Sequence, residues 1–91
     1  MVFTQEDIEK VMAEFKRRID MDIEDGDIPC NARFLHTEIA ARMQGVYGTI
    51  MAVVPNRNWQ DAVWWLNDEL EKLFEYYGLG KLFNDGGTMN L

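Results

Sequence analysis

The chain has 91 residues, of which 47% are hydrophobic and 27% are charged, and its formal net charge at pH 7 is −7. This length suits a single domain without a second core, and the hydrophobic fraction excludes a chain that is disordered by composition. The acidic excess argues against direct binding of nucleic acid, because phosphate groups are neutralised by clustered lysine and arginine. An acidic surface suits a basic partner instead, although it also keeps a small protein soluble.

Cysteine usage and the amino-terminal sequence indicate the compartment. Cys30 is the only cysteine, so no internal disulfide bond can form, and a reducing compartment is the simpler expectation. Residues 1–10 lack the basic start and apolar run of a signal peptide, and no uncharged apolar stretch reaches membrane-spanning length. We therefore expect a cytoplasmic protein that makes no membrane contact.

The first helix is predicted over residues 5–25. Thr4 is a suitable N-cap, and Asp7 three residues later completes a capping box, while Phe3 is placed to pack against Ile8. Gly26 is a suitable terminator. The apolar residues recur at helical spacing and form one stripe that must be buried: Ile8, Val11, Met12, Phe15, Ile19 and Ile23.

An acidic run covers the last turns of this helix and the loop after it. Its carboxylates lie at the negative end of the helix dipole, a local conflict that can mark a working surface. An EF-hand calcium site needs glycine at its sixth position and glutamate at its twelfth, but counting from Asp20 gives Asp25 and Asn31, so no metal site is expected. A partner-binding patch and a solvated loop remain as alternatives. The residues of this patch are Asp20, Asp22, Glu24, Asp25 and Asp27.

The second helix is predicted over residues 32–54, with Asn31 as its N-cap. Gly45 and Gly48 interrupt it, each at a cost of about 1 kcal/mol relative to alanine. Either the helix continues, with Ala41, Ala52 and the two glycines admitting a close neighbour, or it breaks near Gly45; we favour the continuous helix. Its wide apolar stripe makes it the helix that we expect to be most buried. The stripe comprises Leu35, Ile39, Met43, Val46, Ile50 and Val53, widened by Ala40, Tyr47 and Val54.

Part of this segment is similar to a DNA-binding motif. Ala41, followed four residues later by Gly45 and then by Val46, resembles the helix-turn-helix signature of phage repressors and Cro proteins. Gln44 departs from that signature, which places a buried apolar residue there, and residues 48–54 carry almost no side chain that reads bases or holds phosphate. The resemblance therefore implies, as an alternative, a degenerate helix-turn-helix regulator that has lost DNA binding.

The third helix is predicted over residues 58–77. Asn58 is expected to cap it, and Gly78 is expected to close it in a Schellman motif, with Leu79 packed against the last helical turn. Beyond it, residues 84–87 carry strong turn chemistry, which predicts either a tiny hairpin or a frayed tail. The apolar stripe of the helix comprises Trp59, Ala62, Val63, Leu66, Leu70, Leu73, Phe74 and Tyr77.

Three aromatic side chains of this helix do not fit the stripe. Trp64 projects almost opposite its centre, and Trp65 and Tyr76 lie at its margin. Tryptophan and tyrosine are common hot-spot residues, and exposed apolar patches usually mark contacts. We therefore predict that all three bind a partner or a second copy of the chain. The alternative is that the acidic loop or the C-terminal segment packs over them.

Patterns that support catalysis are sparse. His36 is the only histidine, the chain contains no serine, and Cys30 lies six residues before His36, which is not a recognised activating arrangement. The carboxylates lie in exposed runs, where nothing would raise a pKa for acid–base catalysis. We expect neither an enzyme nor a bound cofactor.

The sequence as a whole predicts an all-α fold: a small antiparallel three-helix bundle over residues 1–91 with a short irregular or hairpin-like C-terminal tail. The predicted function is non-catalytic binding of a protein with a basic surface. In composition and size the chain is similar to phage-encoded inhibitors of host defence or transcription machinery, such as anti-CRISPR proteins, and this likeness implies mimicry that occludes a nucleic-acid-binding groove. The alternatives are a homo-oligomeric structural protein, a homodimer included, and a small-ligand sensor lined by Met43, Tyr47, Met51 and tryptophan.

Overall fold

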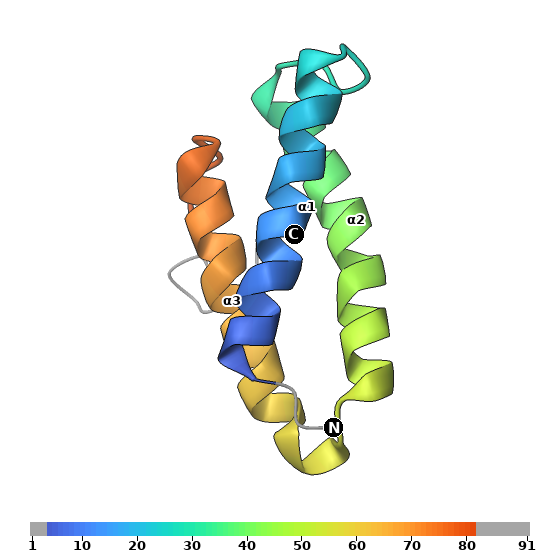
Figure 1. Cartoon of the computed structure of the whole chain (residues 1–91). Coiled ribbons are helices and arrows are strands. Elements are labelled where there is room, and N and C mark those ends of the chain that lie inside the picture. Colours follow the sequence, from blue (N-terminus) through green and yellow to red (C-terminus); the bar gives the residue numbers. More distant parts are fainter. Residues whose placement is uncertain (1–3, 82–91) are drawn as a thin grey trace.

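A computed structural model of the chain describes residues 4–81 and shows the predicted all-α bundle. Its elements are α1 (Gln5–Glu24), α2 (Ala32–Val53), the short 3-10 helix η1 (Asn56–Asn58) and α3 (Trp59–Tyr76). Successive helices run in opposite directions, so α1 and α3 point the same way (Figure 1). Each helix begins and ends at the predicted residue or next to it. Within residues 4–81, no helix is long and apolar enough to cross a membrane.

The first two helices begin at the predicted caps. The Thr4 hydroxyl accepts a hydrogen bond from the Asp7 backbone N–H at 3.2 Å, and the Asp7 carboxylate accepts one from the Thr4 backbone N–H at 2.9 Å. This is the complete capping box. At α2, the Asn31 side-chain oxygen accepts from the Arg33 backbone N–H at 2.9 Å. The predicted packing of Phe3 falls outside the described residues.

The start of α3 differs from the prediction that Asn58 caps it. The chain enters α3 through η1, in which the Asn58 backbone N–H donates to the Pro55 carbonyl at 2.8 Å, and the Asn58 side chain makes no capping bond. With φ −106° and ψ 0°, Asn58 lacks the extended backbone from which a cap side chain reaches the first turn. The Trp59 indole N–H instead donates to the Val54 carbonyl at 2.8 Å, which leaves Trp59 42% exposed rather than in the core.

Both α1 and α3 end in Schellman motifs at the predicted glycines. Gly26 and Gly78 have φ values of +81° and +69°. The Asp27 N–H donates to the Asp22 carbonyl and the Leu79 N–H to the Phe74 carbonyl, each at 2.8 Å, which is the six-to-one bond of this motif. Leu79 packs against the core, as the sequence predicts. The predicted hairpin or frayed tail at residues 84–87 lies outside the described residues.

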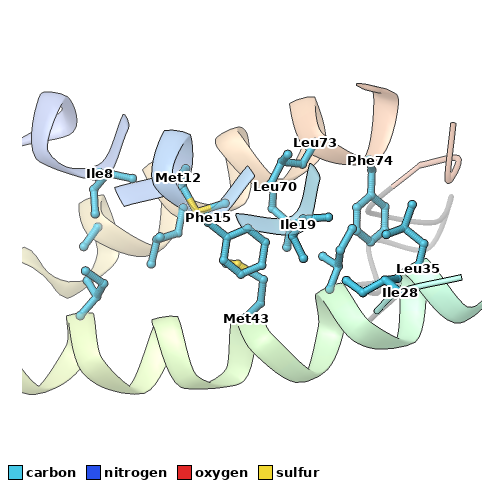
Figure 2. Close-up of a cluster of buried hydrophobic side chains, with 14 of the residues drawn as sticks. Ile8, Met12, Phe15, Ile19, Ile28, Leu35, Met43, Leu70, Leu73 and Phe74 are labelled. Carbon is cyan, nitrogen blue, oxygen red and sulfur yellow. The ribbon is translucent and has the colours of Figure 1, made fainter. Parts of the chain in front are cut away.

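One hydrophobic core lies where the inner faces of the three helices meet. Figure 2 shows Phe15 directed from α1 toward Met43 of α2, with Ile28 and Leu35 closing the end near Phe74. The predicted stripes supply nearly all of this core. Within residues 4–81 the buried hydrophobic residues are Ile8, Met12, Phe15, Ile19, Ile28, Leu35, Ile39, Met43, Ile50, Val54, Ala62, Leu66, Leu70, Leu73 and Phe74.

The second helix is continuous through Gly45 and Gly48, so this segment does not form a helix-turn-helix. A Cβ atom added at either glycine would meet nothing within 4 Å, so the glycines admit no close neighbour from the described part of the chain. The expectation that α2 is the most buried helix is wrong, because four of its 22 residues are buried, against five of the 18 residues of α3. Phe34 and Val53 of α2 are 59% and 60% exposed, and the backbone of α1 approaches α3 more closely than it approaches α2.

The glycines give the first prediction. Gly78→Ala and Gly26→Ala should each lower the free energy of unfolding by about 1 kcal/mol, because an L side chain is strained at positive φ. Gly45→Ala and Gly48→Ala should each raise it by about 0.5–1 kcal/mol, because the added methyl meets open space in a helix interior. Urea denaturation followed by far-UV circular dichroism measures all four; a loss of stability in the α2 pair would contradict the continuous helix.

Candidate interaction surface

Asp20 and Tyr76 belong to a polar cluster that joins α1 to α3. The Asp20 carboxylate accepts hydrogen bonds from Lys16 Nζ at 3.0 Å and from the Tyr77 hydroxyl at 2.5 Å. Lys16 Nζ also lies 4.0 Å from the centre of the Tyr76 ring, within the range of a cation–π interaction. Burial, together with the hydrogen bond to Asp20, raises the pKa of the Tyr77 hydroxyl well above its ordinary value. Both predicted site residues therefore already have partners inside the molecule.

Asp22 joins α1 to α2. Its carboxylate lies 2.6 Å from an Arg42 guanidinium nitrogen, and a second nitrogen of Arg42 lies 2.9 Å from Glu38. The side chains of Asp22 and Arg42 are only 30% and 32% exposed, so the pair is partly shielded from water. Asp22 is therefore part of the structural link between two helices.

The rest of the predicted acidic patch faces solvent. Glu24, Asp25 and Asp27 are exposed and make no ion pair within residues 4–81. They lie at the α1–α2 connection, whereas α3 begins at the opposite end of the bundle (Figure 1). Trp64 lies five residues into α3, about 8 Å from its start. The acidic loop and Trp64 are thus two separate surfaces.

Trp64 is 69% exposed, more than any other large hydrophobic side chain among residues 4–81. Trp65, next to it, is half-buried and packs against the core. The helical spacing places four acidic residues on the same outward face as Trp64, within one to three turns of it. We call these five residues the Trp64 surface: Asp61, Trp64, Asp68, Glu71 and Glu75.

The acidic residues of the Trp64 surface are largely unpaired. Asp61, Glu71 and Glu75 make no ion pair within the described part of the chain. Asp68 lies 3.9 Å from Lys72, whose closer partner is Glu69 at 3.1 Å. Lys72 is the only basic residue of α3, which carries five acidic ones. This surface therefore keeps its negative charge.

Several acidic residues of α1, by contrast, pair with basic residues. Glu14 lies 2.5 Å from Arg17 and 3.1 Å from Arg18. The hydrogen bond from Arg17, with a second one from Arg18, lowers the pKa of Glu14 to about 2. Glu6 pairs with Lys10 at 3.6 Å. Trp64 was predicted from the sequence as a contact residue, whereas the acidic residues around it were not, although their spacing at 61, 68, 71 and 75 is visible in the sequence.

A hollow lies beside Trp64 on this outward side of α3. Among the described residues it is lined by Trp64, Trp65, Asn67, Asp68 and Glu71. Asn67 is fixed from the inner side, because its side-chain oxygen accepts a hydrogen bond from the Tyr47 hydroxyl of α2. The hollow thus combines two indole surfaces with two carboxylates.

The other residues considered for catalysis or ligand binding do not form a common site within residues 4–81. The His36 ring centre lies 5.3 Å from that of Phe74, and Cys30 is an exposed thiol. Burial raises the pKa of the Tyr47 hydroxyl to about 12. Met43 is buried, and Met51, like Tyr47, is half-buried against the core. Within residues 4–81, no three His, Cys, Asp or Glu side chains gather closely enough to hold a metal ion.

Comparisons of the chain with models of known protein families, with curated protein sequences and with solved structures returned no match.

Replacing Asp22 or Asp25 by asparagine tests which acidic residues near the end of α1 contribute to the stability of the fold. Asp22→Asn should lower the free energy of unfolding by about 1 kcal/mol, because it removes the charge that pairs with partly shielded Arg42. Asp25→Asn should change it by less than about 0.5 kcal/mol, and toward greater stability, because Asp25 is an exposed acid at the negative end of α1. Thermal and urea denaturation measure both. Equal losses would contradict the structural assignment of Asp22.

Proposed function

We propose that the protein is a non-catalytic binding module that docks a basic protein partner on the Trp64 surface. The observation that carries this proposal is the 69% exposure of Trp64 amid acidic residues that have few internal partners. A large indole left in water gains binding energy when a partner covers it, and tryptophan is among the residues that most often dominate interfaces. The surrounding carboxylates attract a basic partner and orient it.

The rigidity of the platform supports this proposal. Leu66, Leu70 and Phe74, on the opposite side of α3, are fully buried, so the Trp64 surface is presented by a helix whose orientation is already fixed. Binding then requires ordering of a few side chains rather than of a segment, which lowers its entropic cost. Two hydrogen bonds also hold α3 in this orientation. The Tyr77 hydroxyl donates to Asp20 of α1, and the Tyr47 hydroxyl of α2 donates to Asn67 of α3.

A specific form of this function is occlusion of a nucleic-acid-binding groove in the cytoplasm. Such grooves are lined by lysine and arginine, which neutralise phosphate, and are therefore suited to an acidic helix face. Asp61 and Glu75 are separated by fourteen residues of α3, about 21 Å along the helix axis, a length that can follow a groove. An inhibitor of a host defence or nucleic-acid-handling protein, as phages encode, would act in this way.

The test is capture of a partner from lysate of the cells in which the protein acts, followed by binding measurements with the purified partner. Trp64→Ala should weaken binding by at least about tenfold, because a hot-spot aromatic is removed. The double variant Glu71→Lys with Glu75→Lys should weaken it as strongly at low salt and less at high salt, since charge attraction is screened by salt. Nucleic acid should compete with the protein if the partner's groove is the target.

Matched controls keep this test specific. Phe34→Ala removes an aromatic that is 59% exposed on α2, and Glu24→Lys with Asp27→Lys reverses charge at the α1–α2 connection, outside the Trp64 surface. Both should leave binding within about twofold, and circular dichroism should show all variants folded. Binding that survives Trp64→Ala, or that is lost equally in the controls, would overturn the proposal.

Self-association through α2 is the second candidate, and a specific feature favours it. The outer face of α2 carries Phe34, Ala41, Gly45, Gly48 and Ala52, all exposed, and the chain has no charged residue from 44 to 56. In a protein of net charge −7, an uncharged face is where two copies can meet without repulsion. Two such helices would approach closely at the glycines.

Sedimentation equilibrium tests self-association directly. A dimer is expected at micromolar concentration, and Ala52→Glu should convert it to a monomer, because two added carboxylates would face each other across the two-fold axis. Trp64→Ala, on the other helix, should leave the mass unchanged. A monomeric mass for the unaltered protein up to millimolar concentration would exclude this candidate.

A further inference from the structure

We propose that the hollow beside Trp64 is a receptor for an arginine side chain of the partner. This inference rests on the proposed function and names the group that the Trp64 surface recognises. The lining supplies what a guanidinium ion needs: the flat indole face of Trp64 on which it can stack, and the carboxylates of Asp68 and Glu71 to accept its N–H groups. An anionic group would be repelled by these two carboxylates, and a neutral group would gain no charge attraction from them.

The carboxylates lie where such a contact requires them. Asp68 follows Trp64 by four residues and Glu71 by seven, so both occupy the same helix face one and two turns beyond the indole. Glu71 makes no ion pair within residues 4–81. No lysine or arginine is among the described residues that line the hollow. The site therefore carries the acceptors without an internal cation.

The basic residue nearest in sequence does not fill this position. Lys72 is 3.1 Å from Glu69 and 3.9 Å from Asp68, and it lines the groove between α1 and α3 together with Tyr76. The hydrogen bond from Lys72 to Glu69 holds the ammonium group on that side of α3. The outward side of Asp68 thus remains open to a partner.

A cation bound between an aromatic ring and a carboxylate already occurs elsewhere in this molecule. Lys16 Nζ lies 4.0 Å from the centre of the Tyr76 ring and 3.0 Å from the Asp20 carboxylate. A cation, an aromatic face and a carboxylate are thus already combined at the α1–α3 contact. At Trp64 the aromatic face and the carboxylates are present, and indole attracts cations more strongly than phenol does.

Arginine fits this lining better than lysine. Guanidinium is planar, so it stacks on an indole face while its edge donates to carboxylates on either side. Ammonium is a compact and strongly hydrated charge that gains less from stacking. The Asn67 oxygen is already engaged by Tyr47, which leaves the carboxylates of Asp68 and Glu71 as the acceptors for this edge.

The test uses three synthetic peptides of identical length in which glycine alternates with arginine, lysine or citrulline. The probe is the indole N–H resonance of each tryptophan in ¹⁵N-labelled protein, assigned from single Trp→Phe variants. The arginine peptide should shift the Trp64 resonance saturably, with an affinity at least about threefold higher than the lysine peptide, and the uncharged citrulline peptide should not shift it. The Trp59 resonance should not move, because its N–H is bonded to Val54.

Variants separate stacking from charge. Trp64→Leu keeps an apolar side chain but removes the aromatic face, and it should remove the preference for arginine over lysine. Asp68→Asn with Glu71→Gln keeps the shape and removes both charges, and it should weaken arginine binding at least about tenfold. Because all three residues are exposed, these variants are expected to fold.

The opposing outcomes are equally defined. Equal affinity for arginine and lysine peptides, equal affinity for citrulline, or no shift of Trp64 would each overturn the arginine site. If partner capture depends on Trp64 while the arginine peptide does not bind, the proposed binding function is supported and the proposed arginine site is contradicted. If the peptide binds while no partner depends on Trp64, the proposed function fails and the receptor chemistry stands.

Discussion

Burial of one stripe of α3 determines the rest of the structure. Leu66, Leu70 and Phe74 are fully buried and meet side chains from both other helices, so the rotation of α3 about its axis is fixed. Trp64 precedes Leu66 by two residues, which places it about 200° around the helix. Its indole therefore points to solvent as a necessary result of how the core is built. The rotation of α3 that buries the core residues is thus the same rotation that exposes Trp64.

Charge is distributed unevenly between the two parallel helices. In α1, Glu14, Asp20 and Asp22 are held by basic residues of the same or a neighbouring helix. In α3, the acidic residues around Trp64 make one ion pair within residues 4–81, from Asp68 to Lys72, and Lys72 is shared with Glu69. Most of the ion pairs that hold acidic residues are thus in α1, whereas the acidic residues around Trp64 remain available to a partner.

Local patterns predicted the helices because they depend on neighbours in sequence. The capping box at Thr4 and the Schellman motif at Gly78 require only residues within one turn. The cap at Asn58 failed because η1 changed the backbone on which a cap depends. The roles of Asp20 and Asp22 could not be predicted, since Tyr77 and Arg42 lie 57 and 20 residues away and local spacing does not reveal such pairs.

The pairing of α1 with α3 also has a consequence for the order in which the protein folds during synthesis. The first helix packs most closely on the last one, and the bond between Asp20 and Tyr77 closes a loop that contains all of α2. Chains emerge from the ribosome amino-terminus first, so α1 must wait for its main partner until nearly the whole described chain has been made. Until α3 has been made, the core lacks the stripe on which α1 packs most closely, so the bundle becomes stable only as a single event that follows the synthesis of α3.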